Sequence, residues 1–235
     1  MYRRGRKGNI GGLTGAAYVP GHRPEMKFKD TVISATALAA AGAVVNAESI
    51  LTIPQDNTES GRHGRKISLQ RIQIKGMFTK KDNSAATDPD LLTPQSYVRF
   101  CLVVDHQANA DNSGLQPLVY EGLSAGGTGD AGFLSFRNLA NTSRFTILKD
   151  KVVKLSSDIE QLTDASGNGS SWLSLPSKQK LDVYVKCNIP IAYTGTTGAI
   201  GERTNNNLAI IIFSNDVDPT KVTFEGTVRV RYLDY

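Results

Sequence analysis

The chain of 235 residues is 40% hydrophobic and 21% charged, which is ordinary for one large globular domain. It has no run of eighteen or more apolar residues, so we expect no membrane-spanning helix and no membrane insertion. The most apolar early stretch, 36–45 (TALAAAGAVV), is short, rich in alanine and far from the charged start, so we also expect no signal peptide.

The first 24 residues show no hydrophobic period and contain mainly basic residues, glycines and prolines. The sequence therefore predicts a flexible basic arm over 1–24 and a folded domain over 25–235. Residues 1–29 carry seven Lys or Arg and one Glu, a net charge of +6, whereas twenty Lys or Arg and twenty-one Asp or Glu leave the rest at −1. Such an arm attracts polyanions by neutralising phosphates. A solubility tail or a cloning remnant is the alternative interpretation.

Beyond the arm, the pattern predicts strands separated by turn-rich loops, with no convincing helix. Alternation is clearest in 180–188, where Leu181, Val183, Val185 and Cys187 share one face. The eight expected strands are 28–37, 48–53, 66–78, 97–105, 144–155, 180–188, 208–213 and 221–233.

Two of these strands have unusual patterns. The stretch 208–213 (LAIIIF) is apolar at every position, so we expect it in a sheet that is covered on both faces. In 66–78 the apolar positions change parity between Leu69 and Ile72. A β-bulge at Gln70–Arg71 would restore one buried face along the whole strand.

Eight antiparallel strands with long polar connections favour an all-β fold, an eight-stranded jelly roll built as a two-sheet β-sandwich. The two longest connections, 107–143 and 156–179, exceed what a compact domain normally devotes to structureless loops. Long loops of this kind are usually functional surfaces, so we expect them to make contacts or to decorate the outside.

No catalytic, metal or cofactor pattern emerges from the residue spacing. The two cysteines, Cys101 and Cys187, lie in apolar runs and are expected to be small buried hydrophobic residues. The stretch 127–132 fits G-x-G-x-x-G, but no helix pattern follows it, so we interpret it as a flexible loop. We therefore expect no metal, no cofactor and no enzymatic activity.

A second cationic cluster, GRHGRK at 61–66, precedes the strand with the expected bulge. It is interpreted either as a solvated turn or as a nucleic-acid contact. Neither cationic cluster has interleaved aromatic residues. The pattern therefore favours contacts to phosphates without sequence preference over base stacking.

Residues 53–76 (IPQDNTESGRHGRKISLQRIQIKG) fit the pattern I-x-Q-G-x-x-x-x-x-R-x-G-x-x-I, with Asp56 in place of the first glycine. This stretch resembles the capsid proteins of circular Rep-encoding single-stranded DNA (CRESS-DNA, circovirus-like) viruses. Three further pieces agree in order, so that the resemblance spans nearly all of 25–235: VRFCLVVDHQ (98–107), SRFTILKDKVVKL (143–155) and VTFEGTVRVRYLDY (222–235).

The resemblance implies a viral capsid protein whose jelly-roll subunits form a homo-oligomer, a T=1 icosahedral shell that packages circular single-stranded DNA. The basic arm would lie inside against the genome and would also bind a host nuclear import factor. We would then expect the protein in the virion, and in the host nucleus and cytoplasm before assembly.

The arm departs from the circovirus pattern because it has only four cations in its first eight residues. Genome binding would then depend partly on other cations of the inner surface. The candidate nucleic-acid-binding residues are Arg3, Arg4, Arg6, Lys7, Arg23, Arg62, Arg65, Lys66 and Arg71.

Two alternatives remain open at the level of sequence. One is the capsid of a small RNA satellite-type virus, because no residue pattern reports contacts to the sugar. The other is a non-viral jelly-roll binding module, lectin-like or nucleic-acid-binding, that acts as a monomer or small oligomer.

Overall fold

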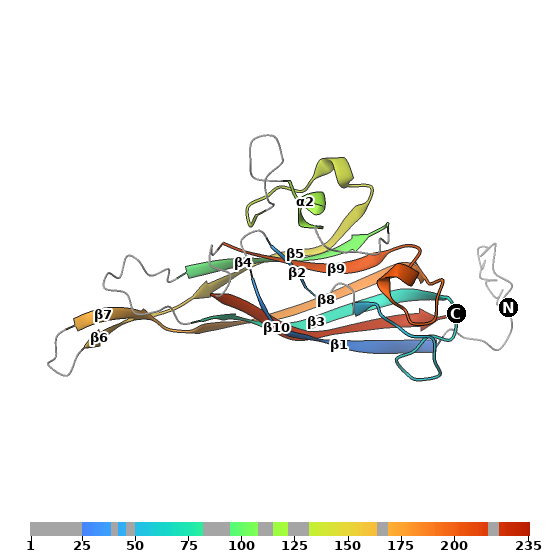
Figure 1. Ribbon diagram of the computed structural model, residues 1–235, viewed down its shortest axis with the longest axis horizontal. Coiled ribbons are helices and arrows are strands. Elements are labelled where there is room, and N and C mark those ends of the chain that lie inside the picture. The colour runs from blue at the N-terminus through green and yellow to red at the C-terminus, as the bar shows by residue number, and fades with distance from the viewer. Residues whose placement is uncertain are drawn as a thin grey trace, which may run out of the picture.

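The computed structural model describes residues 25–38, 42–45, 50–81, 95–107, 115–121, 132–163, 169–215 and 221–235. Within them, two four-stranded antiparallel sheets pack face to face, and a separate two-stranded ribbon extends from one end of the sandwich (Figure 1). The chain passes back and forth between the two sheets. Most neighbouring strands within a sheet are therefore not consecutive in sequence; β4 and β5 are the exception among the described strands of the sandwich.

Sheet A has the strand order β1-β10-β3-β8 and sheet B the order β2-β9-β4-β5. This is the strand arrangement of a jelly roll, as the sequence predicts. The strands of sheet A are β1 (Glu25–Ala37), β3 (Lys66–Lys80), β8 (Ser177–Ala192) and β10 (Val222–Asp234). Those of sheet B are β2 (Ala43–Val45), β4 (Gln95–Asp105), β5 (Phe145–Ser156) and β9 (Asn207–Ser214).

The main core lies between the two sheets and is formed by the inward positions of each strand. Phe224 of β10 lies at its centre, with its ring centroid 4.8 Å from that of Phe78 and 6.5 Å from that of Phe100 on the opposite sheet. Burying each such aromatic side chain contributes about 1.5–3 kcal/mol. The period-two pattern of these strands is therefore enforced by a continuous apolar layer.

A second, smaller core covers the other face of sheet B. Ala209, Ile211 and Phe213 of β9 pack there against the covering segment, by which we mean the described residues 115–121 and 132–145, including Tyr120, whose ring meets Phe213 edge-on at 5.4 Å. This segment contains the short helix α2 (Gln116–Val119) and the 3₁₀ helix η2 (Leu139–Asn141), and it lies above sheet B in Figure 1. The prediction that 208–213 is covered on both faces is confirmed.

The predicted β-bulge is also confirmed. In the ladder between β10 and β3, Arg231 pairs with Arg71 and Tyr232 pairs with Leu69, so Gln70 has no partner. The ladder between β3 and β8 shifts its register at the same place. As a result Leu69 and Ile72 are both buried, although they have opposite parity along the strand.

The second strand was predicted in the wrong place. Residues 50–53 lie outside the sheets, and the strand that pairs with β9 is Ala43–Val45. Ile50, Leu51 and Ile53 are nevertheless fully buried in the main core, which explains their strand-like apolar pattern.

The connection 156–179 is not structureless. It contains β6 (Ile159–Thr163) and β7 (Gly169–Ser174), which pair with each other and form the ribbon that projects beyond the sandwich in Figure 1. A last 3₁₀ helix, η3 (Ile200–Glu202), lies between β8 and β9. Among the described residues, no helix is long and apolar enough to cross a membrane.

Candidate nucleic-acid interface

The folded domain begins and ends at the same end of the sandwich. Glu25, the first described residue, pairs with Asp234 on β10, and Asp234 pairs on its other side with Ile67 on β3. Neighbouring strands lie about 4.8 Å apart, so the arm joins the domain about 10 Å from the start of β3. Arg3, Arg4, Arg6, Lys7 and Arg23 belong to this arm and lie outside the described residues.

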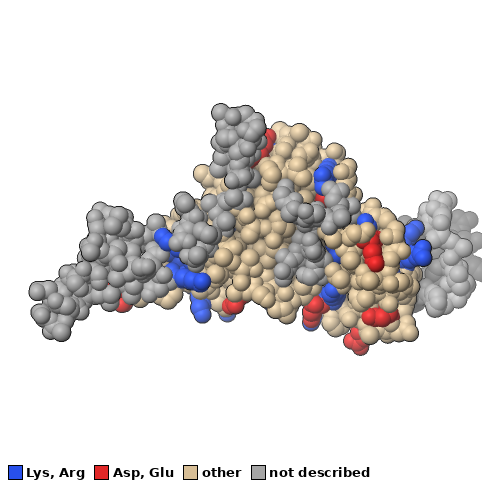
Figure 2. All heavy atoms as spheres, viewed as in Figure 1, with Lys and Arg blue, Asp and Glu red and all other residues tan. Residues whose placement is uncertain are grey.

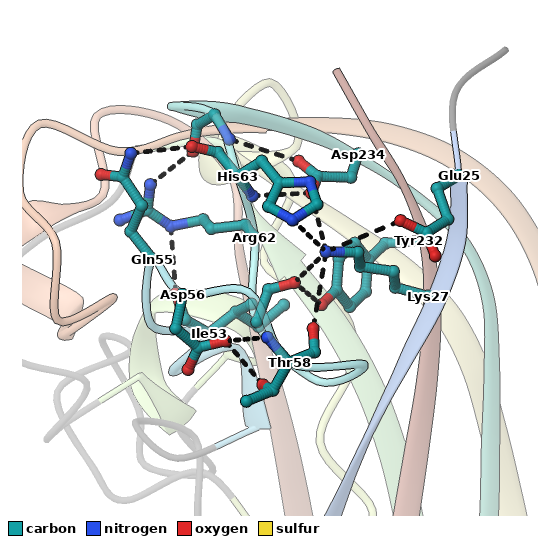
Figure 3. Close-up of polar contacts among 12 residues, drawn as sticks. Glu25, Lys27, Ile53, Gln55, Asp56, Thr58, Arg62, His63, Tyr232 and Asp234 are labelled. Atoms are coloured by element: carbon teal, nitrogen blue, oxygen red, sulfur yellow. Dashed lines mark hydrogen bonds and ion pairs between the residues drawn. The ribbon is translucent and has the colours of Figure 1, made fainter. Parts of the chain in front are cut away.

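The loop between Pro54 and Arg65 is anchored to β1 and β10 at this end by a buried lysine (Figure 3). Lys27 Nζ donates to the carbonyl oxygen of Gly61 at 3.0 Å and lies 3.3 Å from Asp234 Oδ2. Both of these charged side chains are only 3% exposed. Asp234 Oδ2 also accepts the backbone N–H of His63 at 2.7 Å. The loop is therefore fixed to the first and last strands by paired charges.

Local turn chemistry shapes the same loop. Asp56 Oδ1 accepts the backbone N–H of Thr58 at 2.8 Å and the Thr58 hydroxyl at 2.5 Å, and these bonds lower the pKa of the Asp56 carboxyl. A Cβ atom at Gly61 would stand 1.6 Å from that same oxygen, so a larger residue would displace the Asp56 carboxylate from its bonds to Thr58. The Gly61 carbonyl also accepts the hydroxyl of Tyr232 at 3.0 Å. The glycines of the GRHGRK segment thus have packing roles.

Arg62 is not a surface residue, which corrects its assignment as a nucleic-acid contact. Its side chain is fully buried, and its guanidinium stacks on the ring of Tyr193, 4.3 Å from the centroid. Its three nitrogens donate to the carbonyl oxygens of Ile53, Gly64 and Gly195. Each guanidinium nitrogen donates inside the fold and the side chain is fully buried, so Arg62 stabilises the loop and is not accessible to a phosphate outside it.

The other three predicted residues of the folded domain are exposed. Arg65 ends the anchored loop and Lys66 begins β3, next to the end where the arm joins. Arg71 lies beyond the bulge and points away from the core, on the outer face of sheet A. Among the described residues, none of these three side chains has an ion-pair partner. Arg65 and Lys66 are therefore brought together with the arm, whereas Arg71 lies further along the sheet.

Two cations that were not among the predicted nucleic-acid-binding residues share the face of Arg71. Arg231 and Lys186 pair directly with Arg71 from either side, on β10 and β8. Strand alternation places each of them on an outer face, but only the register of the ladders shows that they are neighbours.

Two further ion pairs of the described residues lie on sheet B and are partly buried. Arg99 makes a bidentate contact with Asp150 next to Tyr120 and Cys101, and Arg144 does the same with Asp105. Burial raises the pKa of the Cys101 thiol to about 12, so it stays protonated at neutral pH and is a poor nucleophile. Within the described part of the chain, no group of His, Cys, Asp and Glu side chains could hold a metal ion.

The sheet order defines the class of the protein as a jelly-roll β-sandwich, an architecture found in viral capsid and lectin domains. No protein-family model matches the chain, and no curated protein sequence matches it. Among solved structures, a 60-mer crystal structure of the BFDV capsid protein matches 71% of this chain and 89% of its own, with 9% identity and a TM-score of 0.14. At that score the likeness carries no argument, and the jelly-roll class rests on the strand order alone.

Proposed function

We propose that this protein is a viral coat protein that assembles into a T=1 icosahedral shell and packages circular single-stranded DNA through its basic N-terminal arm. Two observations together support this function. The described strands form a complete jelly roll, and the net charge is +6 over residues 1–29 but −1 over the rest of the chain. A nearly neutral body can pack against copies of itself without mutual repulsion. Five of the cations lie in the first 24 residues, which contain no acidic residue, and a glycine-rich sequence of this kind can follow nucleic acid along no fixed path.

The position of the arm supports this division of roles. It joins the domain at Glu25, which pairs with Asp234 next to Ile67, and therefore beside the exposed Arg65 and Lys66. Each arm neutralises few phosphates, so one chain binds nucleic acid weakly. Many arms in one closed shell would raise the overall affinity through multivalency.

An exposed apolar patch over sheet B supports self-association. Leu134, Phe136 and Leu139 are 75%, 79% and 73% exposed, and all three belong to the segment that covers the second core. Exposed apolar groups that gather in one segment indicate a protein contact. In a shell of identical subunits, that contact would be with a neighbouring copy.

The basic arm would also act in the host cell. Before assembly, the arm would be recognised by a host nuclear import factor, because short clusters of Arg and Lys are typical of such signals. The mature protein would then be found in the virion. No catalytic role is proposed.

Deleting residues 2–8 tests the role of the arm, because this removes all four cations of the first eight residues. We expect particles to form with the wild-type mass but with much less nucleic acid. Deleting residues 9–15, an uncharged segment of the same length, is the matched control and should leave packaging unchanged. Loss of particles with a folded domain would show that the arm is an assembly element instead.

The nucleic acid extracted from wild-type particles separates the DNA proposal from an RNA satellite-type capsid. Material digested by deoxyribonuclease and resistant to ribonuclease would support a DNA genome, and the reverse pattern would identify RNA.

A further inference from the structure

Three cations form a row across the outer face of sheet A, which we call the cationic row. Arg231 on β10 pairs with Arg71 on β3, and Arg71 pairs with Lys186 on β8. With strands about 4.8 Å apart, three positive charges stand on a width of about 10 Å. The inward neighbours Val230 and Ile72 are buried in the main core, so the row faces outward.

No carboxylate forms an ion pair with this row within the described part of the chain, although Asp30, which Arg229 binds, also interacts electrostatically with Arg231. The side chains of Arg71, Lys186 and Arg231 make no ion pair or hydrogen bond there. The three acidic residues of the same face lie in other rows: Asp30 is bound by Arg229, Asp182 pairs with Lys75, and Glu225 pairs with Met77. Figure 2 shows this mixture of charges along the sheet A side of the molecule.

Like charges directly opposite one another destabilise a sheet. A face that needed only to be soluble could alternate its signs, as the adjacent row does with Asp30 and Arg229. The cationic row therefore suits a ligand that brings several negative charges at short intervals.

Two exposed aromatic rings flank the row. Phe28 on β1 pairs with Arg231 at the edge of the sheet and is 38% exposed, but the Arg229 guanidinium already lies over its ring, 4.9 Å from the centroid. Tyr184 on β8 is two residues from Lys186, on the same face, and is 50% exposed. Cations that follow a backbone beside a ring that stacks on bases are the usual elements of single-strand binding.

We propose that the cationic row binds the phosphate backbone of a single-stranded nucleic acid while Tyr184 stacks on a base. The inference rests on the proposed function for its natural ligand, the packaged genome, and it makes the outer face of sheet A the genome-facing side of the subunit. No described element covers this face, whereas the described residues 115–121 and 132–145 cover the outer face of sheet B (Figure 1).

The test uses the full chain and a fluorescein-labelled oligo(dT) of about twenty nucleotides, long enough to span the row. The row variant is Arg71→Gln/Lys186→Gln/Arg231→Gln. The control variant, Lys149→Gln/Lys151→Gln/Lys154→Gln, removes the same charge from exposed positions on β5, the edge strand of sheet B. Affinity is measured by fluorescence anisotropy at a series of salt concentrations.

For the row variant, we expect the slope of log affinity against log salt to become shallower by about 2, because each lost single-strand contact removes about 0.7. The control variant should keep the wild-type slope. Equal losses in both variants would overturn the proposal, since binding would then follow net charge alone. Tyr184→Leu should weaken binding about tenfold without changing the slope, because it removes stacking and no charge.

Oligo(U) of the same length is the second probe. The wild-type protein should give equal salt slopes with oligo(dT) and oligo(U), because phosphate is the recognised group. If the row variant changes the salt slope with neither probe, the site is refuted. A row variant that changes the particle mass but not the slope would identify the row as a contact between copies, again overturning the proposal.

Folding and assembly are followed separately. Without nucleic acid and at low salt, the row variant should melt no lower than the wild type, because its substitutions relieve repulsion. A lower melting temperature would show that the row is paired inside the fold and would overturn the proposal. Light scattering reports assembly: a chain that binds through the row but forms no particles would uphold this site and refute the capsid function.

Discussion

Lys27 on the first strand and Asp234 on the last form a buried ion pair, with 3.3 Å between the ammonium nitrogen and the carboxylate. Removing one partner leaves an uncompensated buried charge, which typically costs about 3–5 kcal/mol. We therefore expect Lys27→Met to lower the free energy of unfolding by about that amount in urea denaturation. The double variant Lys27→Met/Asp234→Leu should lose less than the sum of the two single variants. Additive losses would mean that the pair is not coupled.

Arg62 and Arg65 are three residues apart and have opposite roles. Arg62→Lys should lower the free energy of unfolding by about 2 kcal/mol or more, because an ammonium cannot reach three carbonyls held in a guanidinium-shaped fork. Arg65→Lys is the matched control, and its exposed position predicts a change within about 0.5 kcal/mol. Thermal or chemical denaturation measures both. Equal effects would contradict the buried position of Arg62.

The exposed pair beside the arm contributes to nucleic-acid binding in the proposed function. Arg65→Gln/Lys66→Gln should make the salt slope for single-stranded DNA shallower by about 1.4, which is two contacts of about 0.7 each. The Arg62→Lys variant, measured below its melting temperature, should retain the wild-type slope. The opposite result would return Arg62 to the interface and remove Arg65 and Lys66 from it.

Alkaline pH should destabilise the protein through its buried thiol. Burial raises the pKa of Cys101 from 9.0 to about 12, so between these values the unfolded chain loses a proton that the folded chain keeps. Stability therefore falls as pH rises above about 9, by at most about 1.4 kcal/mol per pH unit for this one group. Cys101→Val should make that fall shallower from pH 9 to 10. An unchanged slope in the variant would show that Cys101 ionises freely in the native state.

The apolar patch over sheet B is predicted to hold copies together. Leu134→Ser/Phe136→Ser should reduce particle formation in light scattering while leaving the unfolding free energy almost unchanged, because both side chains are mostly exposed. Val32→Ser is the control, since Val32 is 71% exposed on β1 of the other sheet. If the control disrupts assembly and the patch variant does not, the contact surface has been placed on the wrong sheet.

Most of the sandwich was predictable because its strands have one face in a core. Alternation in β8 and the doubly apolar β9 report directly which faces are buried. The prediction of the second strand at 48–53 was wrong for the same physical reason. Ile50 and Ile53 are buried without pairing in a sheet, and burial alone gives them the apolar pattern of a strand. Strand β2, only three residues long, carries too few positions for any period.

The candidate site was harder to predict because it depends on contacts between distant segments. Arg62 is surrounded in sequence by glycines and cations, which indicates a surface turn, but it is buried by Tyr193 and by the carbonyl of Gly195, 133 residues away. The cationic row depends on the register of three strands from separate parts of the chain. Alternation predicts that such residues face outward and cannot show which of them are neighbours.

The most direct test of the central claim is size-exclusion chromatography of the purified full chain with light scattering and absorbance at 260 and 280 nm. A T=1 shell of sixty chains of 25.4 kDa would have a protein mass of about 1.5 MDa. A capsid protein loaded with nucleic acid should elute in a peak of at least this mass with high absorbance at 260 nm. A peak near 25.4 kDa with the absorbance of protein alone, unchanged across salt and pH, would contradict it and favour a jelly-roll binding module.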